Sequence, residues 1–286
     1  SAALAVSPTK LIPAKPVIAS VAAGNSSATV TITKPTDLTS QSITGYQYSI
    51  NKGASYQNVS VANGKFTVTG LANGVATSVQ IRATNFNGNS PASVSKSVVP
   101  ATTPVAPTIG TVTPSAGALS IAFTAPNNGG NAITGYQYSL DGGANWITPK
   151  TAVKTSPLKV TGLANSTNYH VQLRAVNAMG TGAASTTVDA TTPVLIPGAP
   201  VITLVGKGRT SLTVDVTAPL NTGGGAILNY AYSTDGKTWV PVSPASNSTH
   251  IVINGLKTNT LYAIRIAAIN SAGQGAFASS AARTLQ

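Results

Sequence analysis

The sequence predicts an all-β protein built of three similar sandwich domains in tandem. Three observations predict this architecture: short motifs that recur about every ninety residues, apolar–polar alternation within each repeat, and turn sequences between the alternating runs. A repeat of this length has the size of one sandwich domain and is too long for a solenoid unit.

Three kinds of motif carry the repeat: a Tyr-x-Tyr strand, a Gly-Leu pair and an Asn-x-x-Gly turn. In chain order they are Gly45–Ser49, Gly135–Ser139 and Asn229–Ser233; Gly70-Leu71, Gly162-Leu163 and Gly255-Leu256; and Asn85–Gly88, Asn177–Gly180 and Asn270–Gly273. Their spacing divides the chain into an N-terminal extension, 1–13, and three domains, 14–103, 104–194 and 195–286.

Alternation with a period of two runs through each repeat. In Leu119–Phe123 the odd positions share one apolar face, and in Tyr169–Ala175 the odd positions are apolar while the even ones are polar. Such runs indicate strands with one buried face, and no stretch shows sustained helical spacing.

Turn residues separate the expected strands. Asp235-Gly236 is typical of a two-residue hairpin, whereas Asn51–Gly53 and Asp141–Gly143 are typical of three-residue loops that end in glycine. Counting back from these turns predicts three facing pairs of aromatic side chains: Tyr48 with Tyr56, Tyr138 with Trp146, and Tyr232 with Trp239.

From residue 14 to the end, the pattern resembles fibronectin type III domains of the kind found in bacterial secreted or surface proteins. The resemblance rests on proline-rich entries, the Tyr-x-Tyr strands, the Gly-Leu pairs, and Tyr169 and Tyr262, which match the family's tyrosine corner. It implies Ig-like sandwiches, and two departures stand out. The family's tryptophan on the second strand is replaced in every repeat, and Thr77 stands where the first corner tyrosine is expected. The replacements are Ile32, Phe123 and Val216.

The connections between the repeats are short and contain proline. Thr102–Pro107 joins the first two domains and Thr191–Pro197 joins the second to the third. Proline-containing linkers are semi-rigid, so we expect an elongated rod.

Composition favours a secreted or cell-surface protein. Charged residues make up 8% of the chain against about 25% in typical soluble domains. The absence of cysteine excludes disulfides and is compatible with many compartments. The net charge is +12, but the basic residues are scattered, which argues against nucleic-acid binding and leaves an anionic polysaccharide as a candidate partner. No run of apolar residues is long enough for a membrane span.

The titratable residues predict neither an enzyme nor a metal or cofactor site. Two histidines and five aspartates are spread over the three domains, without the paired carboxylates of a glycosidase or the acidic loop of a calcium site. His170 is expected to be a solvated side chain, and Asp141 and Asp235 to serve turn geometry.

Two surfaces are candidate binding sites. Alternation should turn Ser49 and Ser139 outward together with a flat, mildly basic partner face; the face consists of Gln47, Arg82, Gln137, Gln172, Arg174 and Arg265. Trp146 and Trp239 are either core residues or platforms for sugar stacking, and the cross-strand pairing favours the core.

The N-terminal extension is a candidate assembly strand. Leu4, Val6, Leu11 and Ile12 are apolar anchors that could add to a sheet edge of a neighbouring copy, although docking on their own domain is an equal alternative. The sequence thus predicts a non-catalytic structural or adhesive module, either a stiff spacer or a subunit of a surface filament or coat. Its partners would be further copies or other surface proteins, and the alternative is a carbohydrate-binding module with exposed aromatic residues.

Overall fold

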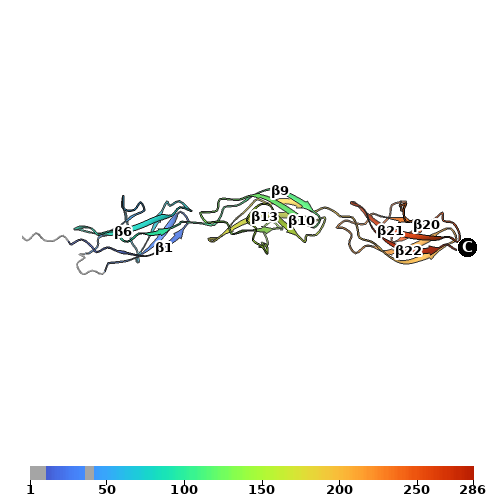
Figure 1. Cartoon of the computed structure of the whole chain (residues 1–286), viewed down its shortest axis with the longest axis horizontal. Helices are drawn as coiled ribbons and strands as arrows, with labels where there is room; N and C mark the ends of the chain where they lie inside the picture. The colour runs from blue at the N-terminus through green and yellow to red at the C-terminus, as the bar shows by residue number, and fades with distance from the viewer. Residues whose placement is uncertain (1–10, 36–41) are drawn as a thin grey trace, which may run out of the picture.

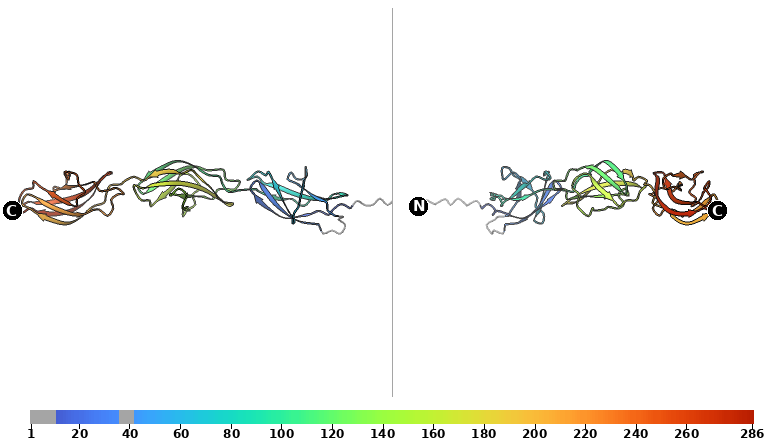
Figure 2. Two further views of the ribbon diagram at one scale, coloured as in Figure 1. Left: turned by 180° about the vertical axis from the view of Figure 1, so that it is seen from behind. Right: turned by 45° about the vertical axis from the view of Figure 1, so that its right-hand side comes forward.

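Three β-sandwiches follow one another in an elongated molecule. The computed structural model describes residues 11–35 and 42–286, and their elements are strands connected by turns and loops. Figure 1 shows the sandwiches end to end, from β1 and β6 through β9, β10 and β13 to β20, β21 and β22. The two further views in Figure 2 keep the same extended shape.

Each sandwich has a three-stranded sheet facing a sheet of four or five strands. The three-stranded sheets have the orders β1-β2-β5, β12-β10-β9 and β16-β17-β20. Their strands are β1 (Val17–Gly24), β2 (Ser27–Thr33), β5 (Lys65–Thr69), β9 (Thr108–Ser115), β10 (Ala118–Thr124), β12 (Leu158–Thr161), β16 (Val201–Lys207), β17 (Leu212–Thr217) and β20 (His250–Ile253).

The facing sheets are built around the Tyr-x-Tyr strands β3, β11 and β18, each paired with a long strand, β6, β13 or β21. Their strands are β3 (Gly45–Ser49), β4 (Gln57–Val59), β6 (Thr77–Asn85), β7 (Gly88–Asn89), β8 (Lys96–Val98), β11 (Gly135–Ser139), β13 (Asn168–Asn177), β14 (Gly180–Ala184), β15 (Val188–Thr191), β18 (Asn229–Ser233), β19 (Val240–Pro241), β21 (Leu261–Asn270) and β22 (Gly273–Arg283).

The predicted alternation places the cores where the sequence indicates. Ile121 and Leu173 of the middle sandwich are fully buried, and the same positions of the outer sandwiches carry buried aliphatic residues. Phe123, which stands where tryptophan was expected, packs its ring 4.4 Å from that of Tyr136 between centroids. An aromatic pair at this separation fills part of the space that an indole would occupy.

The predicted pairing of aromatic residues is wrong by one residue in every domain. Tyr48 pairs with Gln57, Tyr138 with Ile147 and Tyr232 with Val240. The cause is a serine at the end of the Tyr-x-Tyr strand, whose hydroxyl accepts a hydrogen bond from a loop N–H, at 2.9 Å between Ser139 Oγ and Gly143 N. The loop folds around this hydroxyl and is one residue longer than the turn sequence predicted, so Tyr138 faces Ile147 instead of Trp146. A slip of one residue moves Tyr56, Trp146 and Trp239 to the outer face of the sheet.

The predicted tyrosine corners form in the second and third domains. Tyr169 Oη accepts from the N–H of Ala164 at 3.0 Å, and Tyr262 Oη accepts from the N–H of Lys257 at 2.8 Å. In both domains the hydroxyl fixes the loop that follows the Gly-Leu pair, as in the corner of the family.

Candidate functional site

An arginine clamp lies on the outer face of the first sandwich. Arg82 on β6 is opposite Gln47 on β3, and its Nε donates to Gln47 Oε1 at 2.8 Å. The guanidinium carbon lies 3.8 Å from the centroid of the Tyr56 ring, within cation–π range. Gln47 is fixed in turn, since its Nε2 donates to Asn58 Oδ1 at 2.8 Å.

The second sandwich repeats the clamp with different aromatic and polar partners. Arg174 on β13 donates from Nε to Gln137 Oε1 at 2.8 Å, and its guanidinium carbon lies 4.1 Å from the Trp146 ring centroid. Gln137 Nε2 donates to Thr148 Oγ1 at 2.8 Å. The expectation that both arginines point away from the core is confirmed, and each is held by an aromatic ring and a glutamine.

The third sandwich has no such clamp. The position opposite Ala231 on β21 is Ala267, whereas Arg265 lies two residues earlier and pairs with Ser233. Arg265 donates from Nη1 to the carbonyl of Gly236 at 2.8 Å and covers the Phe277 ring at 4.6 Å. Arg265 therefore fixes its own hairpin. The sequence contained a signal for this difference, because Ala231 and Ala267 stand at the motif positions of the glutamine and the arginine of the first two domains.

Two serines predicted to face outward are buried instead. Ser49 is 2% exposed and Ser139 is fully buried, because both hydroxyls lie inside the hairpin loops that they organise. Gln172 stays on the outer face, where its Nε2 donates to Thr187 Oγ1 at 2.8 Å. The outer face therefore lacks these two serines, and it carries Arg82 and Arg174 opposite Gln47 and Gln137.

The two tryptophans lie on the outer faces rather than in the cores. Both are half-buried: Trp146 lies under the Arg174 guanidinium, and the Trp239 ring packs 5.9 Å from Phe277 between centroids. The interpretation of these residues as core aromatics is wrong, and the shift in strand register accounts for it.

A pocket adjoins each clamp at the side of the Tyr-x-Tyr strand. In the second domain a hollow of about 280 Å³ is lined by Tyr136, Gln137, Thr148 and Lys150, among others. Within the described residues the Tyr136 hydroxyl is buried and has no hydrogen-bond partner. Burial also raises the pKa of the Tyr136 phenol above its ordinary value of 10.0. The first domain has a corresponding hollow beside Tyr46 and Asn58.

The described aspartates all have partners close by. Oδ1 of Asp189 lies 2.6 Å from Nδ1 of His170, and Oδ1 of Asp215 lies 2.6 Å from Nδ1 of His250. His170 is therefore exposed, as expected, but also paired. These pairs lie in separate domains, and the described ranges contain no group of three metal-ligating side chains. No helix within those ranges is long and apolar enough to cross a bilayer.

Asp141 and Asp235 organise hairpin loops, as their turn positions predicted. Hydrogen bonds from Ser139 and from Asn145 lower the pKa of Asp141 to about 2. Hydrogen bonds from the backbone of Lys237 and Thr238 hold the pKa of Asp235 far below its ordinary value. Both carboxylates are ionised at neutral pH and are occupied by their own loops.

The junction between the first two domains is a second structural site, which the sequence did not predict beyond its proline-containing linker. Asn177, at the end of β13, donates from Nδ2 to the carbonyls of Thr102 and Asn128, both at 2.8 Å. Thr102 lies on the linker and Asn128 on a loop of the second domain, so one amide clasps the linker to that loop. The backbone N–H of Thr102 adds a bond to the carbonyl of Gly129 at 2.8 Å.

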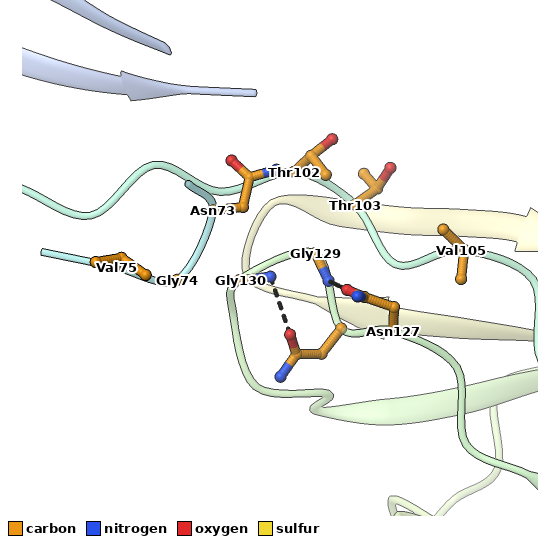
Figure 3. A pocket seen from close by; sticks show the side chains of 10 residues that line it. Asn73, Gly74, Val75, Thr102, Thr103, Val105, Asn127, Gly129 and Gly130 are labelled. Carbon is orange, nitrogen blue, oxygen red and sulfur yellow. Dashed lines mark hydrogen bonds between the residues drawn. The ribbon is translucent and has the colours of Figure 1, made fainter. Parts of the chain in front are cut away.

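A pair of glycines lets the two domains approach each other at this junction. Figure 3 shows the loop with Gly129 and Gly130 beside Thr102 and Asn73, around an open hollow of about 660 Å³. A Cβ on Gly130 would lie 2.3 Å from the backbone nitrogen of Gly74 in the first domain. Both glycines have positive φ, 69° and 87°, so the backbone itself favours glycine here.

The second junction repeats this design. Asn270 donates from Nδ2 to the carbonyls of Leu195, at 2.7 Å, and Thr222, at 2.9 Å. Gly223 and Gly224 have positive φ, and a Cβ on Gly224 would lie 2.8 Å from the carbonyl oxygen of Asn165. Both junctions therefore have the same structure: an asparagine amide that bridges the linker to a loop, and a glycine pair next to the preceding domain.

Residues 11–13 occupy the corresponding place on the first domain. Asn85 Nδ2 donates to the carbonyl of Leu11 at 3.0 Å, and Ile12 lies against Gly88 as Thr103 lies against Gly180. Leu11 and Ile12 therefore contact their own domain. Leu4 and Val6 lie outside the described residues, and the assembly role of the extension stays a prediction.

The Asn-x-x-Gly motif contains a signal for the clasp in addition to its turn. Asn85, Asn177 and Asn270 open the Asn-x-x-Gly motif, and all three are at most 8% exposed. A buried amide needs partners for its donors. Repetition of one asparagine before each turn could therefore have indicated a structural contact of the side chain.

Comparisons with known proteins support the sandwich fold. A sequence model of the Fibronectin type III domain matches residues 104–191. Neural cell adhesion molecule 1-A of Xenopus laevis is 30% identical over 189 residues, which cover 62% of this chain and 17% of that protein. Neural cell adhesion molecule 1-B of Xenopus laevis is 28% identical over 190 residues, with the same coverage. The chain thus spans less than a fifth of the length of these relatives.

Among solved structures, the FN1–FN3 domains of chicken CNTN1 are similar to this chain at 18% identity. The alignment covers 96% of this chain and 100% of the other, with a TM-score of 0.31. At this score the superposition carries no argument about function.

Proposed function

We propose that this chain is a non-catalytic extracellular module, a stiff spacer whose outer faces serve adhesion at a cell surface or in a surface filament or coat. The observation that carries the proposal is the clasp made by Asn177 and repeated by Asn270, which ties each linker to the domain that follows it. A linker with fixed backbone hydrogen bonds transmits orientation, whereas a free linker would let the domains swivel.

The matched relatives agree with an adhesive role. Their names describe neural cell adhesion molecules, and the aligned part covers 17% of each. The chemistry of the described residues points the same way: His170 and His250 lie in different domains and each is paired with a single aspartate, so they do not form the convergent group that catalysis needs.

The stiffness can be tested by measuring distances between paired spin labels. The chain has no cysteine, so Lys65→Cys on β5 and Lys159→Cys on β12 would label two exposed positions in adjacent domains. We expect one narrow distance distribution, and we expect Asn177→Ala to broaden it. A broad distribution in the parent chain would contradict the spacer function.

A second candidate function is carbohydrate binding through the half-buried tryptophans of the outer faces. The register of the hairpins favours it, because it moves Trp146 and Trp239 to the outer faces. Screening on a glycan array, followed by Trp146→Ala and Trp239→Ala with folding checked by circular dichroism, tests this function. Glycan binding that survives both substitutions would exclude stacking on these rings.

A further inference from the structure

Among the described residues, neither Arg82 nor Arg174 has a carboxylate partner. In the described part of the chain, the carboxylates within ion-pair distance of a cation contact His170 and His250, and Asp141 and Asp235 are occupied by their own hairpins. Arg82 and Arg174 are thus cations on the outer faces of a chain with a net charge of +12.

Both guanidinium groups are oriented in advance. Their Nε atoms are engaged by Gln47 and Gln137, and an aromatic ring fixes each guanidinium plane. The two terminal nitrogens form a fork that matches the two oxygens of a carboxylate, and a side chain that is already ordered loses little entropy on binding.

The pocket beside the second clamp supplies further recognition groups. Gln137, which accepts a hydrogen bond from Arg174 and donates one to Thr148, also lines the pocket together with Thr148, so the pocket lies next to the arginine. Lys150 adds a second cation to the lining of this pocket. The volume of about 280 Å³ is at the small end for ligand pockets, which fits one or two sugar units better than a large ligand.

We infer that Arg82 and Arg174, with the pocket that adjoins each, form paired binding sites for an acidic polysaccharide of the carboxylated-sugar class. This inference rests on the adhesive part of the proposed function and names its partner. A uronic acid combines a carboxylate for the guanidinium fork with hydroxyl groups for the pocket. A polymer repeats these groups, which raises the local concentration of carboxylates at each arginine.

The third domain provides an internal contrast. Ala267 replaces the clamp arginine, and Arg265 already donates to the carbonyl of Gly236. The third domain should therefore contribute little to binding, and Arg265→Gln should change the affinity less than about twofold.

The test measures binding of the full chain to polygalacturonate, with neutral dextran and polyglutamate as the other probes. Arg82→Gln/Arg174→Gln should weaken binding to polygalacturonate at least about tenfold, since each charge-assisted contact is worth roughly a tenfold factor or more. Arg82→Lys/Arg174→Lys keeps the charge but removes the fork, and it should also lose most of the affinity. The matched control is Lys65→Gln/Lys159→Gln, which removes the same charge from the three-stranded sheets of the same domains.

Equal losses in the arginine and lysine double variants would show a diffuse effect of net charge and would overturn the inference. Tight binding of neutral dextran, or polyglutamate binding that is stronger and equally dependent on the arginines, would overturn the choice of a carboxylated sugar. Absence of polygalacturonate binding would also overturn the inference. It would leave the spin-label distances untouched, so failure of this proposal and failure of the spacer function are separable.

Discussion

At the scale of single residues, small polar side chains determine the geometry that the sequence pattern left open. Ser139 shifts a hairpin by one residue, and this shift decides that Trp146 lies on the outer face. The alternation correctly predicted that Arg82 and Arg174 point away from the core. The pairing of aromatic residues could not be predicted, because it depends on where one hydroxyl places a loop and not on hydrophobicity.

The hairpin aspartate predicts a pH dependence of stability. Hydrogen bonds lower the pKa of Asp141 from 3.8 to about 2 in the folded state, so its contribution is complete above about pH 4 and is lost as the pH falls toward 2. We expect Asp141→Ala to lower the melting temperature at neutral pH. The difference from the parent chain should shrink between about pH 4 and pH 2. A difference that stays constant over this range would show that the carboxylate's ionisation does not stabilise the fold.

The tyrosine corner predicts a small, local loss of stability. Tyr169→Phe removes one hydrogen bond to Ala164 and should cost about 0.5–1.5 kcal/mol. Leu163→Ala should cost less than the about 2–5 kcal/mol of a fully buried leucine, because Leu163 is half-buried. Chemical denaturation measures both losses when it is followed by the fluorescence of Trp146 in a Trp239→Phe background, so that the signal reports on the second domain. No loss in either variant would contradict a stabilising corner.

At the scale of elements, one serine decides whether the last strand of a domain is continuous. In the first two domains Ser93 and Ser185 accept hydrogen bonds from the N–H groups of Ile81 and Leu173, at 3.0 Å in both cases. The last strand is consequently divided into β7 and β8, or β14 and β15. In the third domain Ala278 pairs with Ile266, and β22 runs unbroken from Gly273 to Arg283. The sequence pattern predicted strands here, but it could not predict that a hydroxyl replaces a backbone acceptor.

Loss of this hydroxyl should destabilise the second domain. Ser185→Ala leaves the buried N–H of Leu173 without its side-chain acceptor and should cost about 1–3 kcal/mol, unless the strand straightens as in the third domain. Amide exchange at Leu173 distinguishes the two results, because a straightened strand protects it again. Ser279→Ala, at an exposed position of β22, is the control and should have little effect. If Ser185→Ala and Ser279→Ala have equal stability and equal exchange, Ser185 has no structural role.

At the scale of the whole molecule, the junctions turn three small domains into one extended unit. The sequence predicted short, semi-rigid linkers, and the repeated clasp by Asn177 and Asn270 adds a physical cause for their stiffness. Proximity of the glycine pairs to the preceding domain could not be predicted, since it depends on contacts between repeats rather than within them.

Close approach at the first junction predicts a difference between two glycine substitutions. Gly130→Ala and Gly162→Ala both place alanine at a positive φ, 87° and 77°, but only the former brings a Cβ against the neighbouring domain. We expect similar losses of stability, of roughly 1 kcal/mol, from the backbone alone. Gly130→Ala should in addition broaden the distances between labels in the first two domains. Identical distance distributions in the two variants would show that Gly130 has no part in the junction.

Small-angle X-ray scattering tests the central claim, that the clasped linkers hold the chain as a stiff rod, most directly. The parent chain should scatter as an extended rod whose largest dimension matches that of the structure. Asn177→Ala/Asn270→Ala should give a smaller average dimension and a smoother distance distribution, because both linkers lose their bridging amides. Asn254→Ala, at an exposed position, should scatter like the parent chain. Identical profiles for the parent chain and the double variant, or a compact parent chain, would contradict the account.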